Sequence, residues 1–415
     1  MHRSLLILRY VDFVDLKYKP NETEVICTFL VEPQGVSMKE AAGAVAAESS
    51  IGTWTELTTI KPYVERLAAH VFSIEDNTAK IAYPIQLFEP GNMPNILSSV
   101  AGNVFGLRTL KNLHLNDVDF PDRLVKSFKG PKYGVEGVRK ILKVYDRPLV
   151  GTIIKPKLGL RTKDHAKVAF EAWAGGCDIV KDDENLSSQK FNTFEDRLVC
   201  TLESRDRAEK KTGERKVYMI NVTAETNEML RRAELVIKHG GEYAMIDILT
   251  CGFSALQTFR QQDFNLVIHG HRAGHAAITK NPKHGISMRV LSKIARIIGV
   301  DQLHVGTVVG KMFETKQEVA ENCDALKMPM ASMKKVMPVA SGGLYPALVP
   351  ALMKFFGTDF IIQAGGGIHG HKDGTMAGAK AMRQAVDATL KGVTLAEYSR
   401  KHKELKAALE TWKNA

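Results

Sequence analysis

The sequence predicts an α/β protein, a (β/α)8 TIM barrel preceded by a ferredoxin-like α+β N-terminal domain. From about residue 149 onward, eight short apolar runs alternate with helical segments, the pattern of a parallel barrel. The first 130 residues instead mix strand-like runs with two short helical segments. The chain has 415 residues, of which 44% are hydrophobic and 25% charged. This composition suffices for two domains and excludes a mostly disordered, collagen-like or disulfide-stapled chain.

The N-terminal domain is expected over residues 1–130. The predicted elements are a strand at 24–31, a small-residue helix at 38–47, two strands within 71–87, a helix at 93–101 and extended sequence through 118. This order of strands and helices resembles a ferredoxin-type sandwich.

The barrel domain is expected over residues 131–415. Its predicted strands are 149–155, 177–181, 216–222, 243–249, 265–271, 302–305, 337–340 and 360–364, and helices between them include 164–173, 194–211, 228–239, 287–298 and 376–390. A final helix at 395–412 carries much of the lysine excess and is expected to be a solvated C-terminal extension.

The charge balance and the cysteines indicate which classes of partner and which compartment suit the protein. The chain has 57 Lys and Arg against 46 Asp and Glu, a net charge of +11, which suits nucleic acid, a membrane surface or a phosphorylated metabolite. No apolar run approaches the roughly 18 residues of a membrane span, and no signal peptide is visible, so we expect a soluble, cytoplasmic protein. Five scattered cysteines without a CxxC pair favour a reducing cytosol and disfavour a zinc site: Cys27, Cys177, Cys200, Cys251 and Cys323.

Polar residues gather where the predicted barrel strands end, which is where barrel enzymes place their chemistry. They are Lys155 and Lys157 after the first strand, Lys181 to Glu184 at the second, His269, His271, Arg272 and His275 at the fifth, His304 at the sixth, Ser341, Gly342 and Gly343 at the seventh, and Gly365, Gly366 and Gly367 at the eighth. The sequence therefore predicts an active site at this end of the barrel.

The second strand suggests a metal site. Asp183 and Glu184 are hard oxygen ligands suited to Mg²⁺, although a salt-bridged acidic turn is the plainer interpretation. Asp182 should point the other way, because neighbouring residues of a strand alternate. An ammonium beside a divalent cation is repulsive, so Lys181 must be displaced, neutral or modified. An amine that captures CO₂ becomes a carbamate, which is an oxygen ligand and a base.

The glycine-rich ends of the seventh and eighth strands favour phosphate binding through backbone N–H groups, although tight turns are the commoner reason for paired glycines. Arg272 and His304 would supply a second anion site, so a ligand with a phosphate at each end is the natural guess. The histidines of the fifth strand are compatible with zinc, but we favour acid–base and phosphate roles for His271. His269 and His275 are as suited to core packing as to supporting that site. Lys311 ends a glycine-bracketed loop and is either a closing group or a solvated surface lysine.

Several segments together resemble the large chain of ribulose-1,5-bisphosphate carboxylase/oxygenase (RuBisCO). Residues 176–185 (GCDIVKDDEN) resemble its carbamylated-lysine motif, 155–160 (KPKLGL) its strand-one signature and 306–311 (GTVVGK) its mobile loop. Residues 48–55 (ESSIGTWT) and 102–106 (GNVFG) extend the resemblance to the N-terminal domain. These motifs are most similar to those of the archaeal-type form III enzymes, which work without a small subunit.

The resemblance implies a carboxy-lyase with a side activity as an oxygenase. Its reaction would be Mg²⁺-dependent enolisation of ribulose bisphosphate, addition of CO₂ or O₂, hydration, and cleavage to two 3-phosphoglycerates. The implied cofactors are Mg²⁺ and an activator CO₂ held as the carbamate on Lys181. The substrate would come from photosynthetic phosphorylation or, as for archaeal-type relatives, from nucleotide (AMP) salvage.

The resemblance also implies a role for each matching residue. Lys181, as a carbamate, would bind Mg²⁺ with Asp183 and Glu184 and remove the C3 proton. Lys155 would protonate the product carbanion with Lys157 holding it, His271 would assist proton transfer, and Lys311 would stabilise the new carboxylate. One phosphate would be held by Arg272, His304 and Ser341, and the other by Thr53, Trp54, Gly343, Gly365 and Gly366. Glu48 and Asn103 would come from the partner subunit, so a homodimer with shared sites would be the minimal unit, with higher oligomers of dimers possible.

Three departures put turnover and CO₂/O₂ discrimination in doubt. Phe313 stands where the family usually carries an acidic residue, and the stretch from Lys311 to Ser341 is shorter than usual. Ile153 replaces a threonine found in many plant-type enzymes.

The main alternative is a RuBisCO-like protein that enolises or isomerises another phosphorylated sugar, such as a diketo-methylthiopentyl phosphate. Residues that this group usually replaces in part are all retained here, which favours a carboxylase: Lys155, Lys311, Glu48, Thr53, Trp54 and Asn103. Nucleic-acid binding is disfavoured because the basic residues are dispersed and aromatic residues amount to only 7%. The convergence of so many reactive groups also disfavours a non-catalytic scaffold.

Overall fold

The computed structural model describes residues 9–55, 57–310 and 313–413. Its contacts divide the chain into two units. The first comprises the chain up to Lys129 together with Gly274–Ile297 and Pro329–Met333, and the second comprises Gly130–Ala273, Ile298–Met328 and the chain from Lys334 onward. The domain bounds expected from the sequence, 1–130 and 131–415, stay a prediction.

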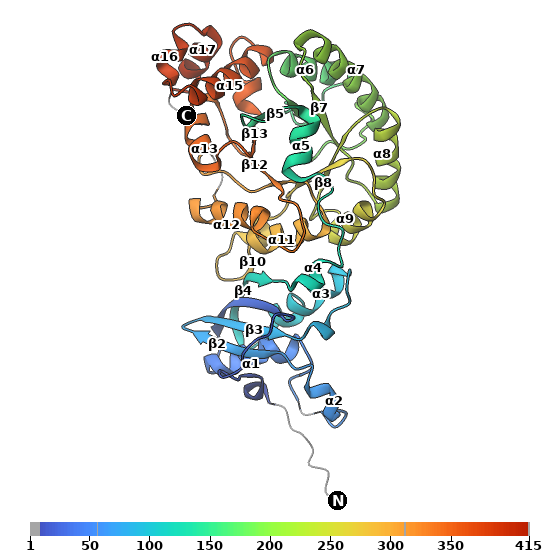
Figure 1. Cartoon of the computed structure of the whole chain (residues 1–415), viewed down its shortest axis with the longest axis vertical. Helices are drawn as coiled ribbons and strands as arrows, with labels where there is room; N and C mark the ends of the chain where they lie inside the picture. The colour runs from blue at the N-terminus through green and yellow to red at the C-terminus, as the bar shows by residue number, and fades with distance from the viewer. Residues whose placement is uncertain (1–8, 56, 311–312, 414–415) are drawn as a thin grey trace, which may run out of the picture. The chain divides into compact units, whose positions relative to one another are not determined.

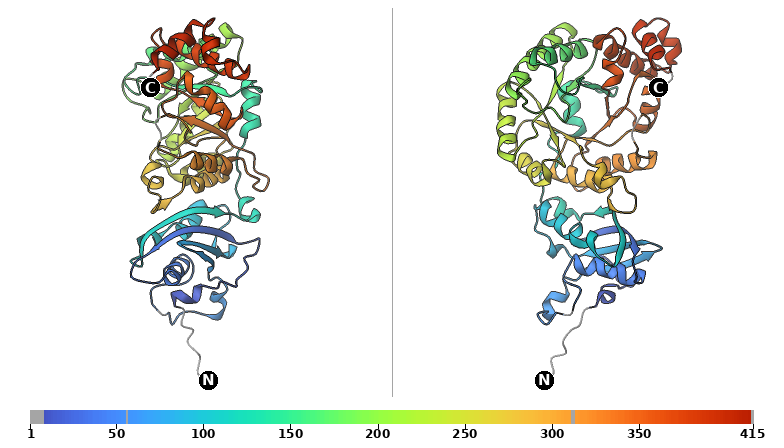
Figure 2. Two further views of the ribbon diagram at one scale, coloured as in Figure 1. Left: turned by 90° about the vertical axis from the view of Figure 1, so that its left-hand side faces the viewer. Right: turned by 180° about the vertical axis from the view of Figure 1, so that it is seen from behind.

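The first unit is built on a mixed five-stranded sheet, which Figure 2 shows with helix α1 beside it. Its strands lie in the order β10-β4-β1-β3-β2, and the pairs β4–β1, β1–β3 and β3–β2 are antiparallel. This arrangement is that of the ferredoxin-like domain that the sequence predicts. Strand β10, which pairs with β4 in parallel, is an addition that the sequence did not predict. The strands are β1(Val25–Pro33), β2(His70–Glu75), β3(Thr78–Tyr83), β4(Leu110–Asp119) and β10(Gly285–Ile286).

Small residues let the helices of this unit approach closely. Helix α1 begins after Ser37, whose side chain accepts a hydrogen bond from the Glu40 N–H. At Gly43 a β-carbon would lie 2.0 Å from the Tyr10 carbonyl oxygen, so only glycine lets the N-terminal turn pack there. The helices of the unit are η1(Tyr10–Phe13), α1(Met38–Glu48), α2(Pro62–Glu65), η2(Ile85–Leu87), α3(Met93–Val100), η3(Asn103–Gly106), α4(Asp122–Val125), α10(Ala276–Thr279) and nearly all of α11(Met288–Ile298).

The second unit is a closed barrel of eight parallel strands, as the sequence predicts. The strand order is β11-β12-β13-β5-β6-β7-β8-β9, and pairing of β9 with β11 closes the ring. In Figures 1 and 2 the helices other than the one at residues 134–142 lie around the outside of this ring. The strands are β5(Leu149–Ile153), β6(Ile179–Lys181), β7(Val217–Asn221), β8(Tyr243–Asp247), β9(Val267–His271), β11(Gln302–His304), β12(Met337–Ser341) and β13(Ile361–Gln363).

The helices of the second unit follow the strands in sequence, apart from α5, which precedes the first of them. They are α5(Gly134–Leu142), α6(Thr162–Ala174), α7(Phe194–Thr212), α8(Thr226–Lys238), α9(Gly252–Gln261), α12(Lys316–Lys327), η4(Pro346–Leu348), α13(Val349–Phe356), α14(Gly366–His369), α15(Thr375–Leu390), α16(Leu395–Ser399) and α17(Lys403–Thr411). None of the helices in the described ranges combines the length and the apolar content that a membrane span requires.

The prediction of one continuous helix over 395–412 is wrong, because the structure has two helices, α16 and α17. The N–H groups of Arg400 and His402 donate to carbonyls three residues earlier, so the chain tightens into a turn. His402 has extended backbone angles, and its ring stacks on Tyr398 with 4.0 Å between centroids. This local stacking stabilises a break that the helical pattern does not reveal.

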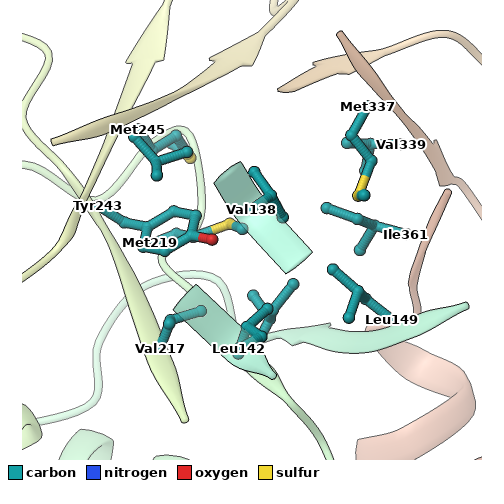
Figure 3. Close-up of a cluster of buried hydrophobic side chains, with 12 residues drawn as sticks. Val138, Leu142, Leu149, Val217, Met219, Tyr243, Met245, Met337, Val339 and Ile361 are labelled. Carbon is teal, nitrogen blue, oxygen red and sulfur yellow. The ribbon is translucent and has the colours of Figure 1, made fainter. Parts of the chain in front are cut away.

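Apolar side chains fill the barrel at the end where its strands begin (Figure 3). Val138 and Leu142 of α5 are almost completely buried there. They belong to one cluster with side chains near the starts of the strands: Leu149, Ile179, Val217, Met219, Tyr243, Met245, Val267, Met337, Val339 and Ile361. Apolar side chains therefore close the barrel at this end, and the polar residues predicted for the active site lie at the other.

Candidate active site

The lysines after β5 lie against the acids after β6. Lys155 Nζ donates to Asp183 Oδ2 at 2.5 Å, and Lys157 Nζ is 3.4 Å from Glu184 Oε1 and 4.0 Å from Asp183 Oδ1. The Asp183 side chain is only 1% exposed. The charges of Asp183 and Glu184 raise the pKa of Lys157. The structure thus brings together two lysines and two carboxylates that come from separate predicted strand ends.

Lys181 is enclosed, and among the described residues its Nζ has no ion-pair partner within hydrogen-bonding distance. Its Nζ lies 3.0 Å from the Met245 sulfur and donates to the Asp182 carbonyl at 2.8 Å. A thioether is a weak acceptor, so it stabilises an ammonium poorly. Burial lowers the pKa of Lys181, and the nearby carboxylates oppose this only in part. Burial therefore shifts Lys181 toward the neutral amine, one of the three outcomes that the sequence left open.

Asp182 points away from this group, as the strand alternation predicts. Its carboxylate accepts from Tyr218 OH at 2.6 Å, from Arg197 Nε at 3.1 Å and from the Asn221 N–H at 3.1 Å. His165 Nε2 lies 3.2 Å away. Burial raises the pKa of Asp182, but Arg197 and the hydrogen bonds outweigh burial and hold it well below its usual range. Asp182 is a buried structural anion.

Glu184 follows Asp183 in the chain and also lies close to a histidine of β9. Its carbonyl accepts from Asn221 Nδ2 at 3.1 Å, and its Oε2 lies 3.8 Å from His271 Nε2. Burial raises the pKa of Glu184, but a backbone hydrogen bond and the basic side chains nearby more than offset this and lower it to about 2. Glu184 is therefore ionised at neutral pH.

Three histidines from β9 and β11 form a buried chain. The Nε2 atoms of His269 and His304 are 2.9 Å apart and share one hydrogen bond, and His269 Nδ1 is 3.0 Å from Gln302 Oε1. His271 Nδ1 lies 2.8 Å from Asp247 Oδ1, which fixes the proton on Nδ1 and leaves Nε2 facing Glu184. Burial lowers the pKa of all three rings, so they are neutral. His275 contacts Thr279 in the first unit.

The two glycine loops border one hollow. A cavity of about 700 Å³ is lined by Gly343 after β12 and by Gly366 and Gly367 after β13, with Leu344, Tyr345, Leu348, Trp412, Val309 and Gly310. A β-carbon on Gly365 would lie 3.1 Å from Lys155 Cε, so the bare backbone there makes room for this lysine. Ser341 ends β12 beside Gln363 of β13. The predicted loops therefore lie together and next to Lys155.

Some predicted residues remain untested. Lys311 lies outside the described residues. Glu48, Thr53, Trp54 and Asn103 lie in the first unit, where Glu48 accepts from Tyr10 OH at 2.8 Å and Trp54 is 82% exposed. The expected roles of Thr53 and Trp54 at a phosphate, and of Glu48 and Asn103 at a partner's site, stay predictions.

Three residues of the candidate site, Asn221, Met245 and Asp247, were not predicted from the sequence. Asn221 and Asp247 are the last residues of β7 and β8, so the strand-end rule would have found them with sharper strand bounds. Met245 lies inside β8 and has the pattern of an ordinary core residue.

Comparison with known proteins decides the family. Residues 134–412 match the model of the ribulose bisphosphate carboxylase large chain, catalytic domain, and residues 12–124 match that of its N-terminal domain. The chain belongs to the RuBisCO large-chain family. Ribulose bisphosphate carboxylase of Methanocaldococcus jannaschii is 50% identical over 97% of this chain and 100% of its own. That of Pyrococcus abyssi is 50% identical over 99% of both chains.

Solved RuBisCO structures agree with the fold. Octameric RuBisCO from Pyrococcus horikoshii, in a complex with sulfate ion, is 49% identical and superposes with a TM-score of 0.96 over 99% of this chain and 98% of that one. Dimeric archaeal RuBisCO from Hyperthermus butylicus is 46% identical, with a TM-score of 0.92 over 98% of this chain and 100% of that one. The RuBisCO fold and the similarity to archaeal RuBisCO that the sequence motifs predict are confirmed.

Proposed function

We propose that this RuBisCO chain is a ribulose-1,5-bisphosphate carboxylase. The single observation that carries the proposal is the buried amine of Lys181, which lies beside the Asp183–Glu184 acid pair and has no ion-pair partner in hydrogen-bonding reach within the described part of the chain. A neutral amine is the form that adds CO₂. The carboxylates that follow β6 and the lysines that follow β5 then supply the charges that such a reaction requires.

The donor set fits Mg²⁺ only with a contribution from Lys181. Within the described ranges, no three His, Cys, Asp or Glu side chains are grouped to hold a metal ion. Asp183 and Glu184 offer two hard oxygen ligands, and a carbamate on Lys181 would add a third while removing a positive charge. When bound, Mg²⁺ would stabilise negative charge that develops on the substrate oxygens.

The protein's own groups would handle the protons. Lys181, as the carbamate, would take the C3 proton of ribulose bisphosphate. His271 has its Nδ1–H held by Asp247, so its Nε2 would accept a proton during hydration and cleavage. Lys155 Nζ donates to Asp183 and would deliver a proton to the product carbon, with Lys157 holding Lys155 in place.

The two phosphates would be bound on opposite sides of this group. Arg272, His304 and Ser341 would hold one, and Gly343, Gly365 and Gly366 would present backbone N–H groups to the other, with Gly342 supporting their loop. Thr53 and Trp54 would help to hold this second phosphate. Glu48 and Asn103 would reach the site from a partner subunit, and Lys311 would contact the carboxylate formed from CO₂. The relatives described as dimeric and octameric support assembly of this chain into dimers or oligomers of dimers.

Addition of O₂ in place of CO₂ would make the same site an oxygenase. This proposal follows from the family and would be tested by the products formed from ribulose bisphosphate under O₂.

The deciding experiment is fixation of labelled CO₂ that depends on ribulose bisphosphate, after preincubation with bicarbonate and Mg²⁺. We expect 3-phosphoglycerate from the wild-type chain and none from Lys181→Ala. Lys167→Ala, which changes an exposed lysine of α6, serves as the matched control and should stay active. A folded, activated chain that fixes no CO₂ would favour an enolase acting on another phosphorylated sugar.

A further inference from the structure

Arg272, one of the proposed phosphate ligands, is already in contact with an anion of its own chain. Its Nη2 donates to Oε1 of Glu314, which lies between β11 and α12. The two side chains are 6% and 3% exposed, so this ion pair is shielded from solvent. An ion pair of this kind is screened little by salt, and its partners are strongly coupled.

The pair is packed against bare backbone. Gly306 has φ +94°, and a β-carbon there would lie 3.2 Å from Arg272 Nη2 and 3.2 Å from Glu314 Cδ. The absence of a side chain at Gly306 therefore lets the carboxylate reach the guanidinium. Burial lowers the pKa of Arg272, and the Glu314 carboxylate opposes this effect.

One nitrogen of the guanidinium, Nη1, is not used by the ion pair with Glu314. Arg272 Nη1 is buried and has no hydrogen-bond partner among the described residues. A buried cationic donor without an acceptor is costly, so this side of Arg272 favours a further anion. A phosphate at Nη1 would then stand on the same guanidinium as the Glu314 carboxylate, and the two like charges would repel each other.

We propose that Glu314 is an internal anion that competes with the substrate's phosphate for Arg272 and so sets the affinity of the site. The inference rests on the proposed phosphate-binding role of Arg272. Glu314 is a positioning residue, because it acts on the ligand through the guanidinium.

The test is calorimetric titration of the full-length chain with inorganic phosphate. Glu314→Gln keeps the size of the side chain and removes its charge, so phosphate should bind about tenfold more tightly, or about 1.4 kcal/mol. Glu321→Gln on α12 is the matched control and should bind as the wild type does. In an Arg272→Ala/Glu314→Gln double variant the gain should vanish, because it passes through Arg272.

Unchanged or weaker phosphate binding by Glu314→Gln would overturn the inference, and weaker binding would mean that Glu314 only orients Arg272. A gain that persists in the double variant would overturn it as well. Thermal melting of each variant checks folding, and Glu314→Ala provides a second removal of the charge with the same expected gain.

Kinetics separate this inference from the proposed function. If the chain fixes CO₂, Glu314→Gln should lower KM for ribulose bisphosphate by a larger factor than any change in kcat. If no variant fixes CO₂ but the phosphate titrations show the gain, the inference stands and the proposed function fails. If fixation occurs without a gain in phosphate affinity, the inference fails and the proposed function stands.

Discussion

Asp182 and Asp183 are adjacent in the chain, yet their carboxylates belong to two separate networks. Asp182 accepts from Tyr218 and Arg197 within the buried layer, at 2.6 and 3.1 Å, whereas Asp183 accepts from Lys155 at the strand ends, at 2.5 Å. The alternation of a strand thus divides one acidic run between a structural and a chemical task. Substitution of Asp182 should therefore affect the stability of the fold, whereas substitution of Asp183 should affect the chemistry of the site.

Asp182→Asn should destabilise the chain strongly. The substitution leaves Arg197, whose side chain is 0% exposed, without its buried counter-charge, and losses of about 3–5 kcal/mol are typical of such a change. Urea denaturation at a fixed protein concentration measures the effect. Asp183→Asn is the matched variant and should cost much less, because its partner Lys155 is 29% exposed and can turn to solvent. Equal losses in both variants would contradict the division of roles.

Activation by CO₂ should depend on pH through Lys181. Its pKa is lowered below the ordinary value of 10.5, and only the neutral amine adds CO₂. As pH falls below the lowered pKa, the amine becomes protonated, so the activation rate should fall about tenfold per pH unit. Above that pKa the rate should level off. Carbamate formation can be followed by ¹³C NMR at constant dissolved CO₂, and a slope that continues unbroken to about pH 10 would contradict the effect of burial.

Met245→Glu should block activation at neutral pH. A carboxylate placed where the sulfur now lies, 3.0 Å from Lys181 Nζ, would pair with the ammonium and raise its pKa. We expect at least about a tenfold loss of carbamate and of CO₂ fixation, since each pKa unit is a factor of ten in neutral amine. Met245→Leu conserves volume and should retain activation. Equal activation of the Glu and Leu variants would show that the neighbour of Lys181 does not control its charge.

Asp247→Asn should lower kcat while leaving KM nearly unchanged. The Asp247 carboxylate accepts from His271 Nδ1 at 2.8 Å and so keeps Nε2 available, whereas an amide can donate to Nδ1 and favour the other tautomer. Loss of such a supporting partner commonly costs about 10–100-fold. Steady-state CO₂ fixation measures it, with Asp206→Asn, an exposed aspartate of α7, as the control. A change confined to KM would argue that His271 serves binding rather than proton transfer.

The architecture was predictable because each barrel strand is an apolar run closed by a turn, a local signal that survives without tertiary knowledge. Lys155, Lys181, Asp183, Glu184 and His271 were predictable because the runs end at polar residues. The two-residue strand β10 was not predictable, since it exists only through its pairing with β4.

Asn221 and Asp247 were hidden by errors of one or two residues in the strand bounds. The predicted runs continued to residues 222 and 249, so both polar residues seemed internal, whereas the strands end on them. The ion pair of Glu314 with Arg272 depends on the bare backbone at Gly306 and on the path of a loop, which no periodic pattern encodes. Sequence thus predicts what local periodicity specifies, and contacts made by loops require the folded chain.

Helix α5 and the apolar cluster beneath it give the barrel a floor as well as a wall. The site can then be entered only from the opposite end of the barrel. For the proposed reaction, the sugar bisphosphate, the gas and both products must pass through this one entrance, so a new substrate molecule cannot bind until the products have left. Slow product release would therefore limit turnover, and the products should be competitive inhibitors with respect to the substrate.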